Sequence, residues 1–357
     1  MRISIRIDGA SAVVGPFDPS AAPAAPFAIA LVEARGALLT WAMPPGRFPD
    51  AAVHAPEQAA EWLADVYGDA VAAAAHRVAA AEDPTAEDVA LPSETLLAID
   101  VRRLALLVWA RDWWPAGTAV PPLDASVLSA EIAIATHGVD HLLDDDEATE
   151  RALADAVDAP SALATFPSAF AADAAALADA LSSLADDHGV ELQPVTERRA
   201  AWALAAGGVG SAADGVEVAH GSAPVRWADV PPQAVSADAE ARWSLRHVAG
   251  EPTLAVEVAA VAGGSAELHA RFGPDELGID MPLALSGAVF TGSVAVPASV
   301  ALLPIEQRTL WVRDVRMAAH PGAAESADAH GSALAHASAR IVDADAGLAE
   351  RAAGARR

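Results

Sequence analysis

The sequence predicts an α+β fold: a helical bundle of four to five helices, a small antiparallel β-sandwich or barrel, and a short β segment at the N-terminus. Three observations predict it. Apolar residues recur every three to four positions in the first half of the chain, they alternate with polar residues in the second half, and a glycine-rich stretch lies between. The expected domains are residues 1–50, 51–206, 216–320 and 321–357.

The first 50 residues predict irregular β structure. Isoleucine alternates with polar residues over positions 3–7, as in a half-buried strand, and two apolar runs at 27–33 and 37–43 flank Gly36, as in a β-hairpin. The pattern leaves open whether these strands pair among themselves or join the C-terminal sheet. No early apolar run follows a basic start, so a signal peptide is not expected and the expected location is cytoplasmic.

Helical spacing dominates the next 130 residues. The four clearest helices are expected to begin at Pro56, near Ser93, at Asp124 and near Ser168. The third is expected to run to about Leu143. Pro115 should end the second and Gly189 the fourth, because proline interrupts a helix and glycine favours its C-cap.

Beyond Gly207–Gly210, which indicates a linker, the apolar period becomes two. Strands are expected over residues 242–247, 253–258, 267–272, 289–296 and 310–313. An uncharged stretch from Met281 to Ile305 is long enough to span a bilayer, but three prolines and two glycines interrupt it. A short strand is therefore expected there. The tail from Gly322 predicts either a final helix or disorder.

Composition narrows the function. The chain has 357 residues, 22 basic and 49 acidic, and a formal net charge of −27. Such a charge opposes binding to phosphate backbones and anionic lipids, so neither nucleic acid nor membrane is an expected partner. Without cysteine the chain has no thiol nucleophile, disulfide or thiolate zinc site, and without lysine it has no Schiff-base chemistry.

His137, His141 and Asp144 are the candidate metal ligands. On a continuous helix the two histidines, four residues apart, share one face, and Asp144 lies on that face about one turn further. Two imidazoles and a carboxylate suit Zn²⁺ or Fe²⁺ with open positions for water. Against a metal site, Gly138 weakens the helix and no glutamate follows His137 to act as a base. The alternative is an ordinary solvated helix face.

An acidic run at Asp144, Asp145, Asp146 and Glu147 is the second candidate site. It belongs to residues 131–191, which contain 14 acidic residues and one arginine. Such a surface can steer a basic partner protein toward the chain. The alternatives are a solvated surface that keeps an alanine-rich protein in solution and, as a rarer possibility, a mimic of nucleic acid.

The adjacent Trp113 and Trp114 form the third candidate. Neighbouring positions on a helix point in different directions, so the two indoles are not expected to face the same core. One of them is expected to contact the β half or a partner protein, where tryptophan is often a major contributor to binding.

These observations favour a non-catalytic interaction or accessory protein that binds another protein through an acidic face and exposed aromatics. No nucleophile elbow, phosphate loop or dinucleotide motif is present. The alternative is a metal-dependent hydrolase or oxidoreductase with a His-x3-His plus Asp site, and Zn or Fe is the only cofactor considered. A triad assembled from distant residues leaves no pattern in one sequence, so no catalytic residue is assigned.

Overall fold

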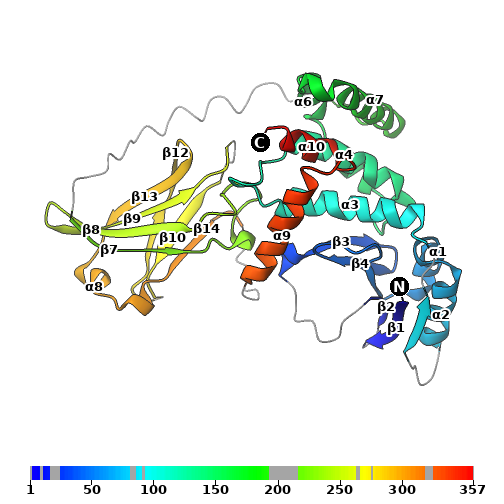
Figure 1. Ribbon diagram of the computed structural model, residues 1–357, viewed down its shortest axis with the longest axis horizontal. Helices are drawn as coiled ribbons and strands as arrows, with labels where there is room; N and C mark the ends of the chain where they lie inside the picture. Colours follow the sequence, from blue (N-terminus) through cyan, green and yellow to red (C-terminus); the bar gives the residue numbers. More distant parts are fainter. Residues whose placement is uncertain are drawn as a thin grey trace. The chain divides into compact units, whose positions relative to one another are not determined.

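The computed structural model describes residues 2–8, 11–16, 25–80, 86–90, 93–192, 216–262, 266–274, 276–317 and 325–356. Within these ranges the chain is an α+β protein with ten α-helices and three antiparallel sheets (Figure 1). The predicted class is confirmed. A bundle of four to five helices followed by a single sandwich is not what these ranges show.

The chain divides into two compact units that do not follow chain order. Unit 1 comprises Met1–Asp112, Leu123–Val195 and Ser326–Ala355, and unit 2 comprises Trp113–Pro122, Thr196–Glu325 and Arg356–Arg357. The tail for which the sequence predicted a helix or disorder contains two helices of unit 1. The predicted linker at Gly207–Gly210 lies outside the described residues.

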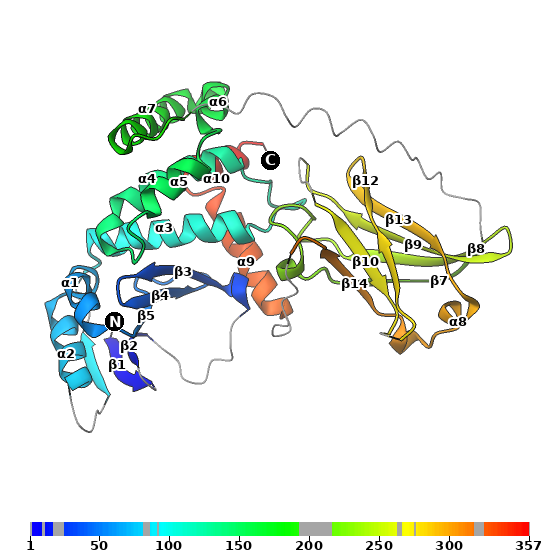
Figure 2. The same ribbon diagram turned by 180° about the vertical axis from the view of Figure 1, so that it is seen from behind.

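Unit 1 contains a six-stranded antiparallel sheet built from the N-terminal part of the chain (Figure 2). In sheet order the strands are β3 Ile29–Ala34, β4 Ala37–Ala42, β5 Asp50–Val53, β2 Ser11–Gly15, β1 Arg2–Asp8 and β6 Glu87–Ala90. The N-terminal strands therefore pair among themselves. The predicted hairpin is β3–β4, and its turn requires Gly36, whose φ is +72° and where an added Cβ would lie 2.4 Å from the carbonyl oxygen of Ala55.

Nine helices of the described chain belong to unit 1. They are α1 Pro56–Tyr67, α2 Asp69–Ala80, α3 Leu96–Trp113, α4 Ala125–Gly138, α5 Ala148–Asp155, α6 Ala159–Ala164, α7 Ala171–His188, α9 Ala327–Arg340 and α10 Leu348–Gly354, with the last residue of α3 assigned to unit 2. The starts at Pro56 and Asp124 are confirmed. The carboxylate of Asp124 caps α4 by accepting hydrogen bonds from the backbone N–H groups of Ser126 (3.1 Å) and Val127 (3.2 Å).

Two helix boundaries differ from the prediction. α3 begins three residues after Ser93, because the hydroxyl of Thr95 accepts a hydrogen bond from the Ala98 N–H at 3.1 Å and so provides the cap. α4 ends at Gly138 rather than near Leu143, and Asp140–Leu142 forms a separate 3-10 turn. Glycine is a poor helix former, which explains the early end.

A buried carboxylate attaches the C-terminal helices to the rest of unit 1. Glu131 of α4 is 4% exposed, and it accepts hydrogen bonds from the backbone N–H groups of Leu348 (2.7 Å) and Ala349 (3.1 Å) at the start of α10. Gly347 permits this approach, since an added Cβ would lie 2.7 Å from Glu131 Oε1. Burial raises the pKa of Glu131, while the two hydrogen bonds oppose that rise.

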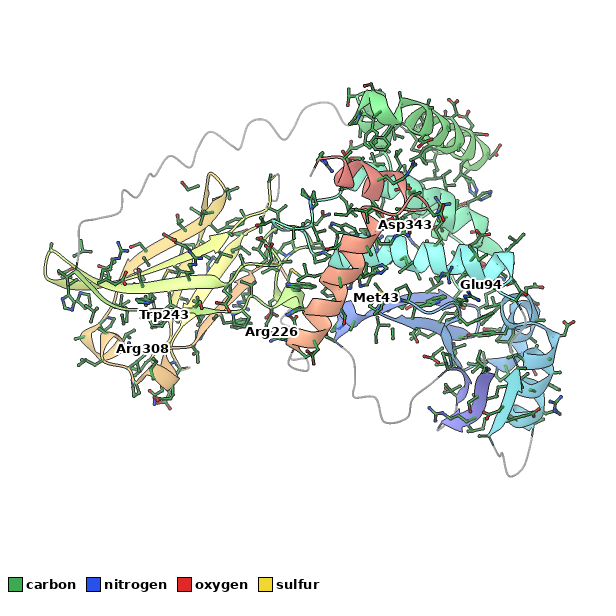
Figure 3. The ribbon with its side chains drawn as sticks, viewed as in Figure 1. Met43, Glu94, Arg226, Trp243, Arg308 and Asp343 are labelled. Carbon is green, nitrogen blue, oxygen red and sulfur yellow. The ribbon has the colours of Figure 1, made fainter. Side chains whose placement is uncertain are left out.

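Unit 2 contains a five-stranded and a three-stranded antiparallel sheet. In sheet order, the strands of the five-stranded sheet are β12 Ala284–Ser286, β13 Val289–Ala295, β9 Glu251–Ala259, β8 Ala241–Val248 and β7 Val216–Ala223. Those of the three-stranded sheet are β11 Ile279–Pro282, β10 Leu268–Phe272 and β14 Leu310–Asp314. The unit also contains one short helix, α8 Ala298–Ala301. The expected alternation is confirmed, because Leu254, Val256 and Val258 are all buried. Trp243 lies on β8 (Figure 3). The centre of its ring lies 4.9 Å from that of Phe272 on β10, and this contact joins the two sheets in one core.

The uncharged stretch from Met281 to Ile305 forms no helical span. It contains the end of β11, the strands β12 and β13, and the four-residue helix α8. Across the described residues, no helix is long and apolar enough to cross a membrane.

Candidate functional site

The two histidines of the predicted metal site face different neighbours. Because α4 ends at Gly138, His137 lies in its last turn and His141 lies in the 3-10 turn that follows. His141 lines an open cleft with Asp65 and Asp100 of α1 and α3. The assumption that the histidines share a helix face is therefore wrong, and no group of three or more His, Asp or Glu in the described part of the chain is placed to hold a metal ion. The metal site itself stays a prediction that a metal assay can test.

His137 instead contacts a histidine and glutamate pair that the sequence analysis did not identify. Its ring meets the ring of His188, at the end of α7, edge to face with centres 5.7 Å apart. Nδ1 of His188 lies 2.8 Å from the carboxylate of Glu150 on α5, and this hydrogen bond lowers the pKa of Glu150. Glu150 and His188 are 38 positions apart in the chain, so no local pattern could have paired them.

Half of the predicted acidic run is already paired inside unit 1. Arg35, in the β3–β4 turn, donates a hydrogen bond to Asp146 at 2.7 Å and another to the carbonyl oxygen of Leu143 at 3.0 Å. Arg151 of α5 forms an ion pair with Asp145. The acidic run was predicted to bind a partner protein, but each of these two carboxylates already pairs with an arginine of its own chain.

Asp144 and Glu147 are the available members of the run. Both are exposed, no ion pair joins Asp144 to an arginine of the described ranges, and Glu147 has only a 4.0 Å approach from Arg151. Asp186 and Asp187, in the last turn of α7, are likewise exposed and without an ion pair in those ranges.

One residue of the predicted tryptophan pair is buried. The side chain of Trp114 is 2% exposed, and its indole N–H donates a hydrogen bond to the carbonyl oxygen of Pro121 at 3.0 Å. Trp113 is half-buried. An exposed aromatic surface therefore does not include Trp114, whose ring is enclosed by its own chain.

A groove between β3 and three helices is a candidate binding site that sequence patterns did not reveal. Its cavity volume is about 420 Å³, which is large enough for a small ligand or a few side chains, and most of its lining is apolar. We call it the β3 groove. It is lined by Leu31, Val32 and Glu33 of β3, Leu104, Val108 and Arg111 of α3, Ile132 and Thr136 of α4, Leu143, and Ala148, Arg151, Ala152, Ala154 and Asp155 of α5.

Charge is concentrated in the unit that contains this groove. Unit 1 has 11 arginines and 34 acidic residues, a formal charge of −23, whereas unit 2 has 11 arginines and 15 acidic residues, a formal charge of −4. A positively charged molecule is therefore attracted mainly to unit 1.

No protein-family model, curated protein or solved structure matches this chain.

Proposed function

We propose that this chain is a non-catalytic interaction protein, which binds a basic region of another protein through an acidic end of unit 1. The acidic end is defined as Asp144, Glu147, Asp186 and Asp187. The observation that carries the proposal is the hydrogen bond between His188 and Glu150. It holds the last turn of α7 against α5, so that two acidic segments distant in the chain lie at one end of these helices.

The electrostatics of this end favour a cationic partner. The four exposed carboxylates of the acidic end repel one another, and Arg35 and Arg151 are already paired with Asp146 and Asp145. Lysine or arginine side chains of a partner would relieve that repulsion. The main gains expected from such a surface are a faster association rate and selection of basic partners.

The proposal can be tested by affinity capture of tagged protein from its native host. The variant reverses all four charges: Asp144→Lys, Glu147→Lys, Asp186→Lys and Asp187→Lys. The matched control makes the same charge change at four exposed glutamates of unit 2: Glu251→Lys, Glu257→Lys, Glu276→Lys and Glu306→Lys. Mass spectrometry should identify a stoichiometric partner with the parent and the control, but not with the variant.

Salt gives the second part of this test. Exposed charge pairs are screened at moderate ionic strength, so the captured partner should be released as salt is raised. A partner that the acidic-end variant retains as well as the parent does, at every salt concentration, would show that the acidic end is not the binding surface.

A further inference from the structure

The β3 groove lies along an open edge of the six-stranded sheet. β3 is a terminal strand of this sheet, and β4 is its neighbour among the described strands, through register pairs that include Val32 with Leu39 and Ala34 with Ala37. α3 lies beside β3 in both ribbon views (Figure 1, Figure 2), and its residues Leu104 and Val108 line the groove. An edge strand presents unpaired backbone groups to any chain that approaches it.

The hydrogen-bond register shows which backbone groups face that edge. The hairpin has a two-residue turn, so the backbone groups of Ala34 and Ala37 form hydrogen bonds with each other. In an antiparallel pair every second residue forms such bonds, so Val32 bonds in the same way to Leu39. The groups of Leu31 and Glu33 therefore point away from β4. The carbonyl of Glu33 confirms this direction, because it accepts a hydrogen bond from the Asp144 N–H at 3.3 Å.

The chain already adds a short piece of strand to this edge. Leu143 forms an isolated antiparallel bridge with Ala34, and the Arg35 N–H donates to the Leu142 carbonyl at 2.8 Å. This pairing stops after Asp144, where the chain turns toward α5. On the part of β3 that this segment does not reach, Leu31 is 46% exposed, and its backbone N–H and C=O have no backbone partner among the described residues.

A second polar group faces the groove without a partner. Thr136 of α4 lines the groove and is only 5% exposed, yet its hydroxyl has no hydrogen-bond partner within the described ranges. Its oxygen is not sealed from solvent, so it is open to a hydrogen bond with a polar group of a bound molecule. The groove thus combines apolar walls, a free strand edge and a free hydroxyl.

The charged residues at the rim of the groove indicate the sign of the charge expected on the bound molecule. Arg111 is hydrogen-bonded to Asp112 and Arg151 is paired with Asp145, so both cations are already compensated. Glu33 forms no ion pair with an arginine in the part of the chain that the structure describes, and Asp155 interacts with Arg111 only at longer range. With Asp112 and Asp145 included, the rim therefore holds four carboxylates against two arginines. Charge complementarity therefore favours lysine or arginine side chains at the rim.

We infer that the β3 groove binds an extended, basic segment of a partner protein, which adds as a strand to β3 at Leu31 and places an apolar side chain in the groove. Main-chain hydrogen bonds to an edge strand supply affinity, and pockets for alternate side chains supply specificity. This inference rests on the proposed function, since it names the kind of segment that the partner contributes.

The test uses the full chain and a fluorescent five-residue peptide of alternating lysine and valine, blocked at both ends. Fluorescence polarisation should detect binding of this peptide. Two control peptides have the same side chains and charge but carry methyl groups on backbone nitrogens. One is methylated at every odd-numbered nitrogen and the other at every even-numbered nitrogen, because only one of these two sets can face β3. One of the two should bind roughly tenfold more weakly, because it cannot donate hydrogen bonds to β3.

The matched protein variants are Leu31→Pro and Leu31→Val. Proline removes the N–H that faces the groove without removing a bond to β4, whereas valine keeps that N–H. The peptide should bind Leu31→Pro roughly tenfold more weakly and Leu31→Val about as tightly as the parent. Thr136→Val, which removes only the hydroxyl, should weaken binding severalfold. This variant and the methylated peptides decide the question if Leu31→Pro does not fold.

Hydrogen exchange followed by NMR reports the site directly. The amide proton of Leu31 should exchange rapidly in the free protein and become protected when the peptide binds. Unchanged exchange at Leu31, or equal affinity for the unmethylated peptide and both methylated peptides, would overturn the inference. Peptide binding could instead be lost in the acidic-end variant and unchanged in the Leu31 and Thr136 variants. That result would exclude the groove as the binding site, while the proposed function would stand.

Discussion

At the scale of single residues, His336 of α9 shows how burial sets acid–base behaviour in unit 1. Its ring meets the ring of Trp109 edge to face with centres 5.5 Å apart, and burial, with a smaller contribution from Arg340, lowers its pKa from 6.5 to about 4. The folded state therefore binds this proton less tightly than the unfolded state. The stability that this residue contributes is complete above pH 6.5 and is lost as the pH falls toward 4.

The variant His336→Gln should remove this part of the pH dependence. Between pH 6.5 and 5 the parent should lose about 1–2 kcal/mol of unfolding free energy through this residue, and the variant should not. Urea unfolding at the two pH values measures the difference. A matched substitution, His76→Gln at an exposed position of α2, should behave like the parent. Equal losses in the parent and in His336→Gln would contradict the assignment.

Asp50 of β5 has the opposite linkage. Burial raises its pKa from 3.8 to about 6, although Arg6 opposes the shift, and Oδ1 is sealed from solvent without a hydrogen-bond partner among the described residues. The folded state therefore binds the proton more tightly. The stability from this residue is complete below pH 3.8 and is lost as the pH rises through about 6.

Replacing this carboxyl with its uncharged isostere should stabilise the protein at neutral pH. We expect Asp50→Asn to raise the unfolding free energy at pH 7 by about 1 kcal/mol, a value reduced for partial exposure to solvent. Because Asp50 is protonated in the folded state at pH 4, the gain should nearly vanish there. Chemical denaturation at both pH values measures this, and an equal gain at both would refute the role of ionisation.

At the scale of elements, the start of α3 separates two candidate caps that the sequence alone does not distinguish. Both Ser93 and Thr95 have a hydroxyl suited to capping, but only Thr95 bonds to the helix. Thr95→Ala should therefore lower the unfolding free energy by about 1 kcal/mol, and Ser93→Ala should leave it nearly unchanged. Thermal unfolding of the two variants measures the contrast, which would be lost if Ser93 were the cap.

The elements also show where sequence patterns succeed. The β3–β4 hairpin, the starts of α1 and α4, the end of α7 and the alternation in β8, β9, β10 and β14 follow from local signals such as Gly36, Asp124 and Gly189. These signals act over a few residues, and the structure confirms them. The predicted end of α4 near Leu143 was wrong because the helix was expected to continue through Gly138, where it ends.

The candidate sites were less predictable, because their contacts span long stretches of chain. Arg35 binds Asp146 across 111 positions, and Glu150 binds His188 across 38. The β3 groove combines residues from a strand and three helices, and its apolar members resemble core positions in the sequence. A pattern at helical or strand spacing identifies a buried face, but it does not show that a groove remains open beside it.

At the scale of the whole molecule, the two units differ in charge far more than in arginine content. Both contain 11 arginines, so the difference between −23 and −4 comes from carboxylates alone. Salt should therefore act mainly through unit 1, where carboxylates of like sign are close together and where both proposed binding surfaces lie.

The placement of Glu131 has a consequence for the order in which a ribosome makes this protein. The partners of its carboxylate are the N–H groups of Leu348 and Ala349, which lie 217 and 218 residues later in the chain. All of unit 2 that lies between Thr196 and Glu325 is therefore translated before α10. Until α10 emerges from the ribosome, the carboxylate of Glu131 lacks both of these hydrogen-bond donors, so unit 1 reaches its final hydrogen bonding only after unit 2 has been made.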